Sequence, residues 1–177
     1  MIREIVRMGN PLLRRVAEDV TLDLAKSESF TQLLLDMRDS MKHYGGIGIA
    51  APQIGVELKV AIIELGEMNR YGEDVNFPFQ VFVNPEIEFL TDELKGHWEG
   101  CLSVPGLRGY VERPNKIKVT YLDENFTKKV IVAEGFLSTV LQHELDHLFG
   151  ILYVDRVKDI TKLTFQQEYE DFILQDG

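Results

Sequence analysis

The sequence FLSTVLQHELDHLFG covers residues 136–150 and predicts the helix around which the rest of the molecule is built. Gly135 precedes this segment and Gly150 closes it, and glycine commonly ends a helix. Apolar side chains recur along it at spacings of three and four residues, the pattern of a helix with one buried face. Leu137, Leu141, Leu145 and Leu148 form one apolar stripe. The neighbouring stripe contains Phe136, Val140 and the two histidines, His143 and His147.

Two histidines of this helix indicate a metal site. His143 and His147 are four residues apart, so a helix places both imidazoles on one face, where they can share one metal ion. Glu144 follows the first histidine and can reach a water molecule on that ion. A divalent cation lowers the pKa of bound water, and a nearby carboxylate can take the proton and pass it on. The alternative is a pair of surface histidines on an amphipathic helix.

A catalytic metal site needs a third protein ligand, and the sequence offers three candidates. Tyr153 stands where one metalloprotease pattern has a third histidine, but neutral tyrosine is a poor ligand. Glu168 stands where another protease pattern has a glutamate, in a polar segment that reads more simply as a solvated helix face. Cys101 would add a thiolate to two imidazoles, a set suited to Zn or Fe(II). A lone cysteine can also be a small buried apolar residue.

The sequence GIGIAAPQ over residues 46–53 resembles a dinucleotide-binding turn, but its context is wrong. That turn must follow a strand and open a helix, whereas here a predicted helix comes before it and Pro52 and Gly55 interrupt any helix after it. We therefore expect no nucleotide site. An extended strand of small residues fits better, since it lets the backbone of a ligand approach closely, with Gln53 as an amide donor. A tight turn followed by a core strand is the alternative.

The remaining pattern predicts an α+β fold, with mostly antiparallel short strands packed around the central metal-binding helix and with an N-terminal and a C-terminal helix. Helices are predicted over residues 11–18, 28–44 and 163–174, a surface loop over 69–78, and a hairpin turn over 123–125. Strands are predicted over residues 58–64, 81–83, 86–89, 117–121 and 130–132.

Composition limits the class of protein. A length of 177 residues predicts a single domain, 1–177, whose last part, 157–177, is a helical tail. The net charge of -10 disfavours broad binding to nucleic-acid backbones. Apolar runs are too short to span a bilayer, and the first residues lack a secretion signal, so we expect a cytoplasmic protein without a membrane partner. The single cysteine cannot form an internal disulfide.

Three segments taken together resemble the peptide deformylase family, which is marked by G-x-G-x-A-A-x-Q, E-G-C-L-S and Q-H-E-x-D-H in that order. They stand here at Gly46–Gln53, Glu99–Ser103 and Gln142–His147. Asn10-Pro11 and residues 150–156 also resemble flanking segments of the family. The resemblance implies a metal-dependent hydrolase that removes the formyl group from the N-terminal methionine of new polypeptides and releases formate.

The resemblance also assigns roles to residues. It makes Cys101, His143 and His147 the ligands of one divalent metal, natively Fe(II), with Zn, Ni or Co able to replace it. It makes Glu144 the general acid/base. Gln53 and the backbone N–H of Leu102 become donors to the developing oxyanion, and Gly48 becomes a backbone partner of the substrate.

The substrate's methionine side chain requires an apolar pocket, for which Ile47, Phe136 and Val140 are the candidates, although each could be a core residue. Gly100 gives close access to the backbone. His97 is a candidate for the pocket rim beside Trp98, and a surface position is equally consistent with the sequence.

The charge of the C-terminal segment limits the partners that it can bind. Some members of the family dock on the ribosome through a basic terminal helix. From Lys158 to Gly177 this chain has two lysines against five acidic residues, a net charge of -3. We therefore predict transient proximity to ribosomes at most, without docking of this tail on ribosomal RNA.

Overall fold

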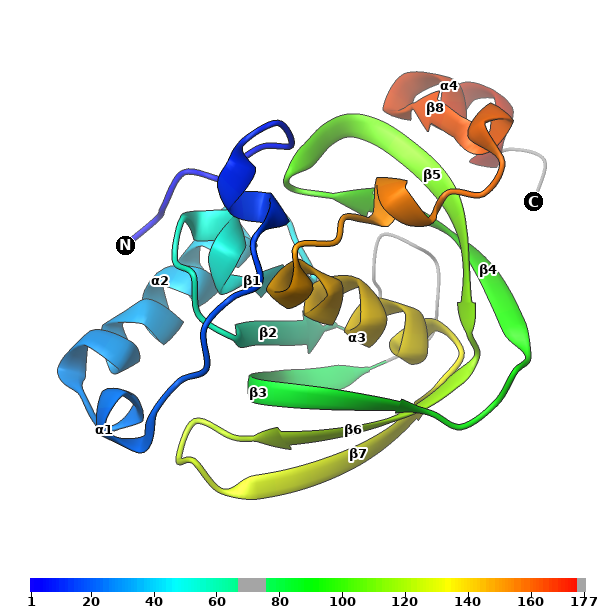
Figure 1. Ribbon diagram of the computed structural model, residues 1–177. Coiled ribbons are helices and arrows are strands. Elements are labelled where there is room, and N and C mark those ends of the chain that lie inside the picture. The colour runs from blue at the N-terminus through cyan, green and yellow to red at the C-terminus, as the bar shows by residue number, and fades with distance from the viewer. Residues whose placement is uncertain (67–75, 175–177) are drawn as a thin grey trace.

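The computed structural model describes residues 1–66 and 76–174, and in it the helix α3 (Phe136–Asp146) lies between two antiparallel sheets (Figure 1). The larger sheet has the strand order β1-β2-β3-β6-β7. Its strands are β1 (Gly48–Ala50), β2 (Val60–Leu65), β3 (Phe77–Phe89), β6 (Lys116–Leu122) and β7 (Lys128–Glu134). The α+β fold expected from the sequence is confirmed.

The smaller sheet has the order β4-β5-β8, with β4 (Leu94–Cys101), β5 (Val104–Pro114) and β8 (Leu163–Phe165). The first two strands form a long hairpin that carries Cys101 at its turn. No strand was predicted here, because β4 contains two glycines and β5 has Pro105 and Gly106 directly after its first residue, residue types that are depleted in strands. Pairing between the two strands outweighs that local preference.

Each face of the large sheet is covered by one helix. Strand residues alternate between the two sides. Ile63 and Phe82 pack in the core that contains α3, whereas Ile62 and Val81 pack in the core that contains α2 (Glu28–His43). The predicted helix 28–44 is confirmed, with Ser27 as its N-cap. The central strands are thus buried on both faces, and α3 is almost wholly enclosed.

Several boundaries differ from those predicted. The α-helix expected over 11–18 is a 3-10 helix, η1 (Pro11–Arg14), and the helix expected over 136–149 ends at Asp146 and continues as η3 (His147–Phe149). The strands expected over 81–83 and 86–89 are parts of the one long strand β3, which also includes the end of the expected loop 69–78. Residues 69–75 of that loop lie outside the described residues. The expected helix 163–174 begins as β8, which pairs with β5, before α4 (Gln166–Phe172) starts.

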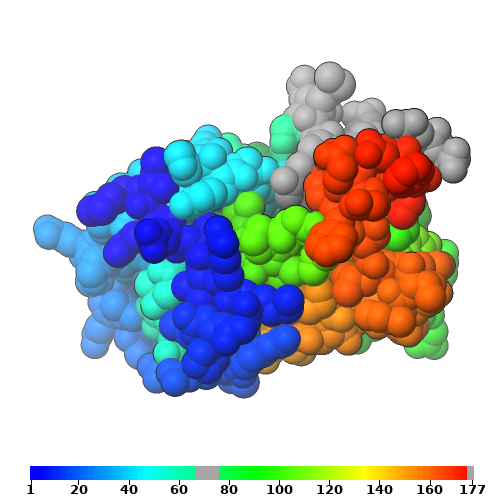
Figure 2. Space-filling model, turned by 90° about the horizontal axis from the view of Figure 1, so that it is seen from above, coloured from blue at the N-terminus to red at the C-terminus, as the bar shows by residue number. Residues whose placement is uncertain are grey.

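The remaining elements are short: α1 (Leu22–Ala25) and the 3-10 helices η2 (Ala51–Ile54), η4 (Tyr153–Arg156) and η5 (Ile160–Lys162). The predicted turn at 123–125 is confirmed, since Asp123 Oδ1 accepts hydrogen bonds from the backbone N–H groups of Asn125 and Thr127. Seen from above, the N-terminal segment (blue) and the C-terminal segment (orange to red) lie on either side of the green part of the chain (Figure 2). No helix in the described part of the chain is long and apolar enough to cross a membrane.

Candidate active site

Three side chains that are distant in sequence converge on one point. The Sγ atom of Cys101 and one ring nitrogen each of His143 and His147 all lie within 4.8 Å of one another. Cys101 Sγ is 3.3 Å from His147 Nε2. A thiolate and two imidazoles at these separations can hold one divalent ion, and three protein ligands leave a position open for water or substrate. The residues present therefore fit a catalytic metal.

The other two candidates for a third ligand lie outside this group. The ring of Tyr153 stacks on the ring of His143, with centroids 5.9 Å apart. Glu168 is exposed on α4. The geometry thus favours Cys101 over both residues.

Two backbone features bring the thiol to the histidines. The ladder between β4 and β5 shifts register between Glu99 and Cys101, and a bulge of this kind re-aims the side chains next to it. On the other side, α3 presents His143 on its face, and His147 follows at its C-cap. The sequence alone predicts that His143 and His147 lie together on a helix. The approach of β4 with Cys101 to this helix depends on long-range pairing, which the sequence does not reveal.

Behind His143 lies a buried cluster of charges. Its Nδ1 atom is 2.6 Å from Glu99 Oε2, so the other ring nitrogen is left for the metal position. Arg113 donates to both oxygens of Glu99, at 2.6 and 3.0 Å, and to Asp146 at 2.8 Å. Burial raises the pKa of Glu99, but the hydrogen bond from His143 and the charge of Arg113 outweigh it and lower this pKa to about 2. Glu99 is therefore an anion that orients the imidazole.

The second histidine differs in its surroundings. His147 is 1% exposed, and burial, together with the neighbouring His143, holds the pKa of His147 well below its usual range. A neutral imidazole is the form that binds metals.

Sequence reasoning missed Arg113 and Asp146 as parts of this cluster. Asp146 lies between the two histidines in the sequence HELDH (residues 143–147), and this position could have indicated that it belongs to the site. Nothing near Arg113 in the sequence distinguishes it from a surface arginine, although it is 2% exposed.

Gln53 is held by three contacts. Its Oε1 atom accepts a hydrogen bond from the backbone N–H of Ala50 at 2.8 Å, while its Nε2 atom lies 3.4 Å from Cys101 Sγ and 3.2 Å from Ser103 Oγ. The amide N–H₂ group is thus directed toward the three converging side chains. The segment 46–53 that contains it forms β1 and the 3-10 turn η2, not a phosphate-binding turn.

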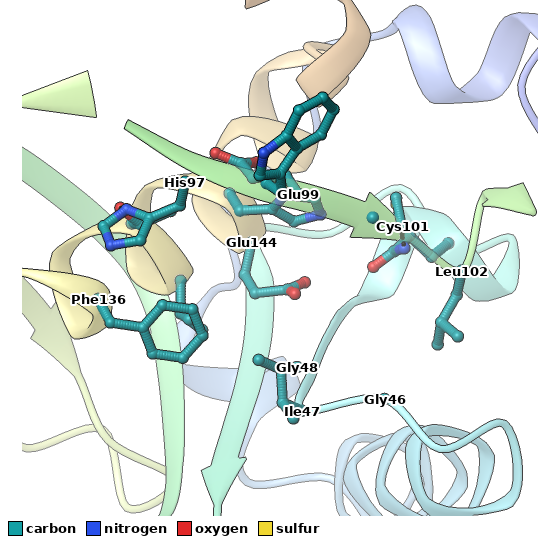
Figure 3. A pocket seen from close by; sticks show the side chains of 15 residues that line it. Gly46, Ile47, Gly48, His97, Glu99, Cys101, Leu102, Phe136 and Glu144 are labelled. Atoms are coloured by element: carbon teal, nitrogen blue, oxygen red, sulfur yellow. Dashed lines mark hydrogen bonds and ion pairs between the residues drawn. The ribbon is translucent and has the colours of Figure 1, made fainter. Parts of the chain in front are cut away.

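A hollow opens beside the three converging side chains, with Cys101 and Leu102 at one end and Phe136 and His97 at the other (Figure 3). Glu144 projects into it opposite Gly48. All site residues named from the sequence line it except His147, which is buried behind it, and Trp98 and Thr139 line it as well. Ile47, Gly100 and Val140, which were also predicted from the sequence, are among the residues that line the hollow.

Comparison with known proteins agrees with this geometry. The family model described as Polypeptide deformylase matches residues 2–163. The chain belongs to the peptide deformylase family. A peptide deformylase of Leptospira biflexa is 49% identical over 163 residues, which cover 92% of this chain and 90% of that protein. Peptide deformylase 2 of Ralstonia nicotianae is 45% identical over 167 residues, covering 94% and 93%.

Solved peptide deformylases share the fold. The class I type b enzyme of Acinetobacter baumannii with Met-Ala-Ser bound superposes with a TM-score of 0.85 at 36% identity, covering 89% of this chain and 99% of that one. The enzyme of Synechococcus elongatus with actinonin gives a TM-score of 0.78 at 34% identity, covering 98% and 85%. Peptide deformylases are hydrolases that remove N-formyl groups from nascent peptides, so the activity predicted from the sequence is confirmed for this chain.

Proposed function

We propose that this chain hydrolyses the formyl amide of N-formyl-methionyl peptides in the hollow beside Cys101, His143 and His147, which hold one metal ion. The observation that carries the proposal is the convergence of these three side chains next to Glu144 and Gln53. We propose Fe(II) as the native ion, with Zn, Ni or Co able to replace it, because one thiolate and two imidazoles suit these metals. A divalent ion bound there supplies Lewis acidity, which polarises the formyl carbonyl and acidifies water.

Glu144 is proposed as the general acid/base. Its carboxylate projects into the hollow from the residue next to His143. In this role it takes a proton from the attacking water and returns it to the amine nitrogen that leaves. The products are formate and a free N-terminus.

Gln53 and the backbone N–H of Leu102 are proposed as donors to the oxygen that gains negative charge. Both residues line the hollow beside Cys101. The hydrogen bond from Ala50 N–H to Oε1 fixes the orientation of the Gln53 amide, and its N–H₂ group would exchange the bond to Cys101 Sγ for one to the oxyanion. Donors that are fixed in advance contribute most to stabilising such an oxyanion.

The substrate backbone is proposed to lie between two sheet edges. β1 ends the large sheet and β4 ends the small one, and Gly48 and Gly100 of these strands both line the hollow. An extended peptide can approach such edges closely because glycine has no side chain. Ile47, Phe136 and Val140 then supply apolar walls for the methionine side chain, with His97 at the far end.

We also propose that residues 1–177 act as a single catalytic domain in the cytoplasm, on nascent peptides at or near ribosomes. The acidic tail carries a net charge of -3 and does not suit docking on RNA. A salt-dependent association with ribosomes that is lost when the tail is removed would contradict this part of the proposal.

The direct test is formate release from formyl-Met-Ala under anaerobic conditions with Fe(II) added. We expect turnover that a chelator abolishes and that added Fe(II) restores, since the reaction depends on the bound ion. Formyl-free Met-Ala serves as the control for peptide cleavage. If fully metallated protein releases no formate, or if it cleaves the peptide bond instead, the proposal is wrong.

Gly48→Ala should impair the reaction by moving Glu144. A Cβ atom at residue 48 would lie 2.6 Å from Cγ and Cδ of Glu144, so the carboxylate must shift. Misplacement of a reacting group by about 1 Å can cost roughly a hundredfold in rate. We expect kcat to fall about ten- to a hundredfold with the metal content unchanged. A kcat within twofold of the unsubstituted protein would show that Glu144 tolerates the shift.

A further inference from the structure

The strand β7 forms an open edge of the large sheet. It is the last strand in the order β1-β2-β3-β6-β7, and in the described part of the chain it pairs with β6 alone. It lies at the lower margin of the molecule in Figure 1. Its register with β6 runs without a shift from Lys128 opposite Leu122 to Glu134 opposite Lys116. The backbone N–H and C=O groups on the outer side of such a strand can pair with a further strand.

The sequence of β7 has few of the features that prevent edge pairing. The strand KKVIVAE (residues 128–134) contains neither a proline nor a bulge, two features that protect the edges of natural sheets. Lysine is a third such feature, but it is confined to the first two residues. Val130 and Val132 are 59% and 52% exposed. Apolar surface therefore lies directly beside the open edge.

The exposed face of β7 is complementary to a second copy of itself. Because side chains alternate along a strand, one face carries Lys128, Val130, Val132 and Glu134. In an antiparallel pairing about a two-fold axis at Ile131, Lys128 faces Glu134 of the second copy. Val130 then faces Val132 of the second copy, and each pairing occurs twice because the axis exchanges the chains. A register shifted by two residues would lose both charge pairs.

These pairings supply the contacts that hold two strands together. Opposite charges that face each other across antiparallel strands stabilise the pair, and like charges destabilise it. Glu134 already pairs with Lys116 of its own chain at 2.9 Å, but these two side chains are 60% and 44% exposed. A carboxylate has two oxygens and can accept from a second lysine as well. The valines add apolar surface that is removed from water.

We propose that β7 is an association surface for a second copy of this chain, and that two large sheets join edge to edge through it as a symmetric dimer. The hollow lies at the other end of the same sheet, where β1 is the last strand, so both copies keep it open. The net charge of -10 on each chain opposes association, and we therefore expect a dimer that dissociates on dilution.

The test is the molar mass of the metal-loaded protein in solution, measured by sedimentation equilibrium over roughly 1–200 μM, where an interface of modest area dissociates. We expect the mass to rise with concentration from the 20.3 kDa of one chain toward twice that value. Lys128→Glu turns both charge pairs into like-charge pairs, so the dissociation constant should rise by about tenfold or more. Glu134→Lys should weaken the dimer similarly, although it changes the net charge in the opposite direction.

A mixture of the two variants tests the register itself. In a mixed dimer one contact joins the two substituted residues and the other joins the two unsubstituted ones, and both contacts are then between opposite charges. The equimolar mixture should therefore form dimers with a dissociation constant within about threefold of that of the unsubstituted protein.

Lys158→Glu is the control for net charge, because Lys158 pairs with Glu112 of β5 and these side chains are 65% and 46% exposed. It should form dimers like the unsubstituted protein. The inference is overturned by a mass of one chain at the highest concentration, by an equal loss in Lys158→Glu, or by a mixture that stays monomeric. The measurement needs no substrate, so its outcome is independent of the proposed function.

Discussion

Glu144→Gln is expected to lower formate release by two to four orders of magnitude while the protein keeps its metal. The substitution preserves the size of the side chain and removes its ability to take a proton, and general acid/base groups typically contribute this much to rate. Cys101, His143 and His147 are unchanged, so the ion should remain bound. The measurement is kcat for formyl-Met-Ala together with the metal content of the same sample.

This experiment separates a catalytic centre from a structural one. If the ion served only to hold the fold, Glu144→Gln would leave its binding and the thermal stability of the protein as they are, and any hydrolysis would stay within tenfold. Apo protein, prepared with a chelator, is the second control, since it should lose activity regardless of residue 144. Loss of metal from Glu144→Gln would instead place this carboxylate among the ligands.

Much of the reaction centre could be predicted from the sequence because its residues follow a local pattern, the spacing of side chains along one helix. Helical spacing places His143 and His147 on one face, and the position of Glu144 follows from the same spacing. The partner of this pair could not be derived in the same way. Residue chemistry ruled against Tyr153 but left Cys101 and Glu168 as alternatives. The resemblance to a family pointed to the cysteine, and the structure places its Sγ atom beside the two histidines.

The parts that sequence reasoning missed depend on pairing between distant residues. β4 and β5 contain glycine, proline and charged residues, and they become strands because each supplies the other with hydrogen-bond partners. The end of the chain was expected to be all helix, yet β8 pairs with β5 through Leu163 and Thr164. A local pattern carries no information about such a partner.

Arg113 is the clearest case of a residue whose role appears only in three dimensions. It lies on β5, and its guanidinium joins Glu99, which supports His143, to Asp146, which precedes His147. Asp146 has a second partner in Arg156, with two contacts of 2.6 Å. Glu99 has no second arginine in the described part of the chain, and its other bond is to His143. Removal of Arg113 would therefore leave Glu99 as the poorly compensated charge.

Arg113→Met should accordingly destabilise the protein by about 3–5 kcal/mol, because it keeps much of the volume and leaves a buried carboxylate without its cation. The free energy of unfolding, measured by chemical denaturation at matched metal content, tests this. Arg15→Met is the matched control: Arg15 pairs with Glu57 at 2.8 Å, but the two side chains are 60% and 38% exposed. That exposed pair should contribute no more than about 1 kcal/mol. Equal losses in the two variants would show that burial adds nothing to the bond between Arg113 and Glu99.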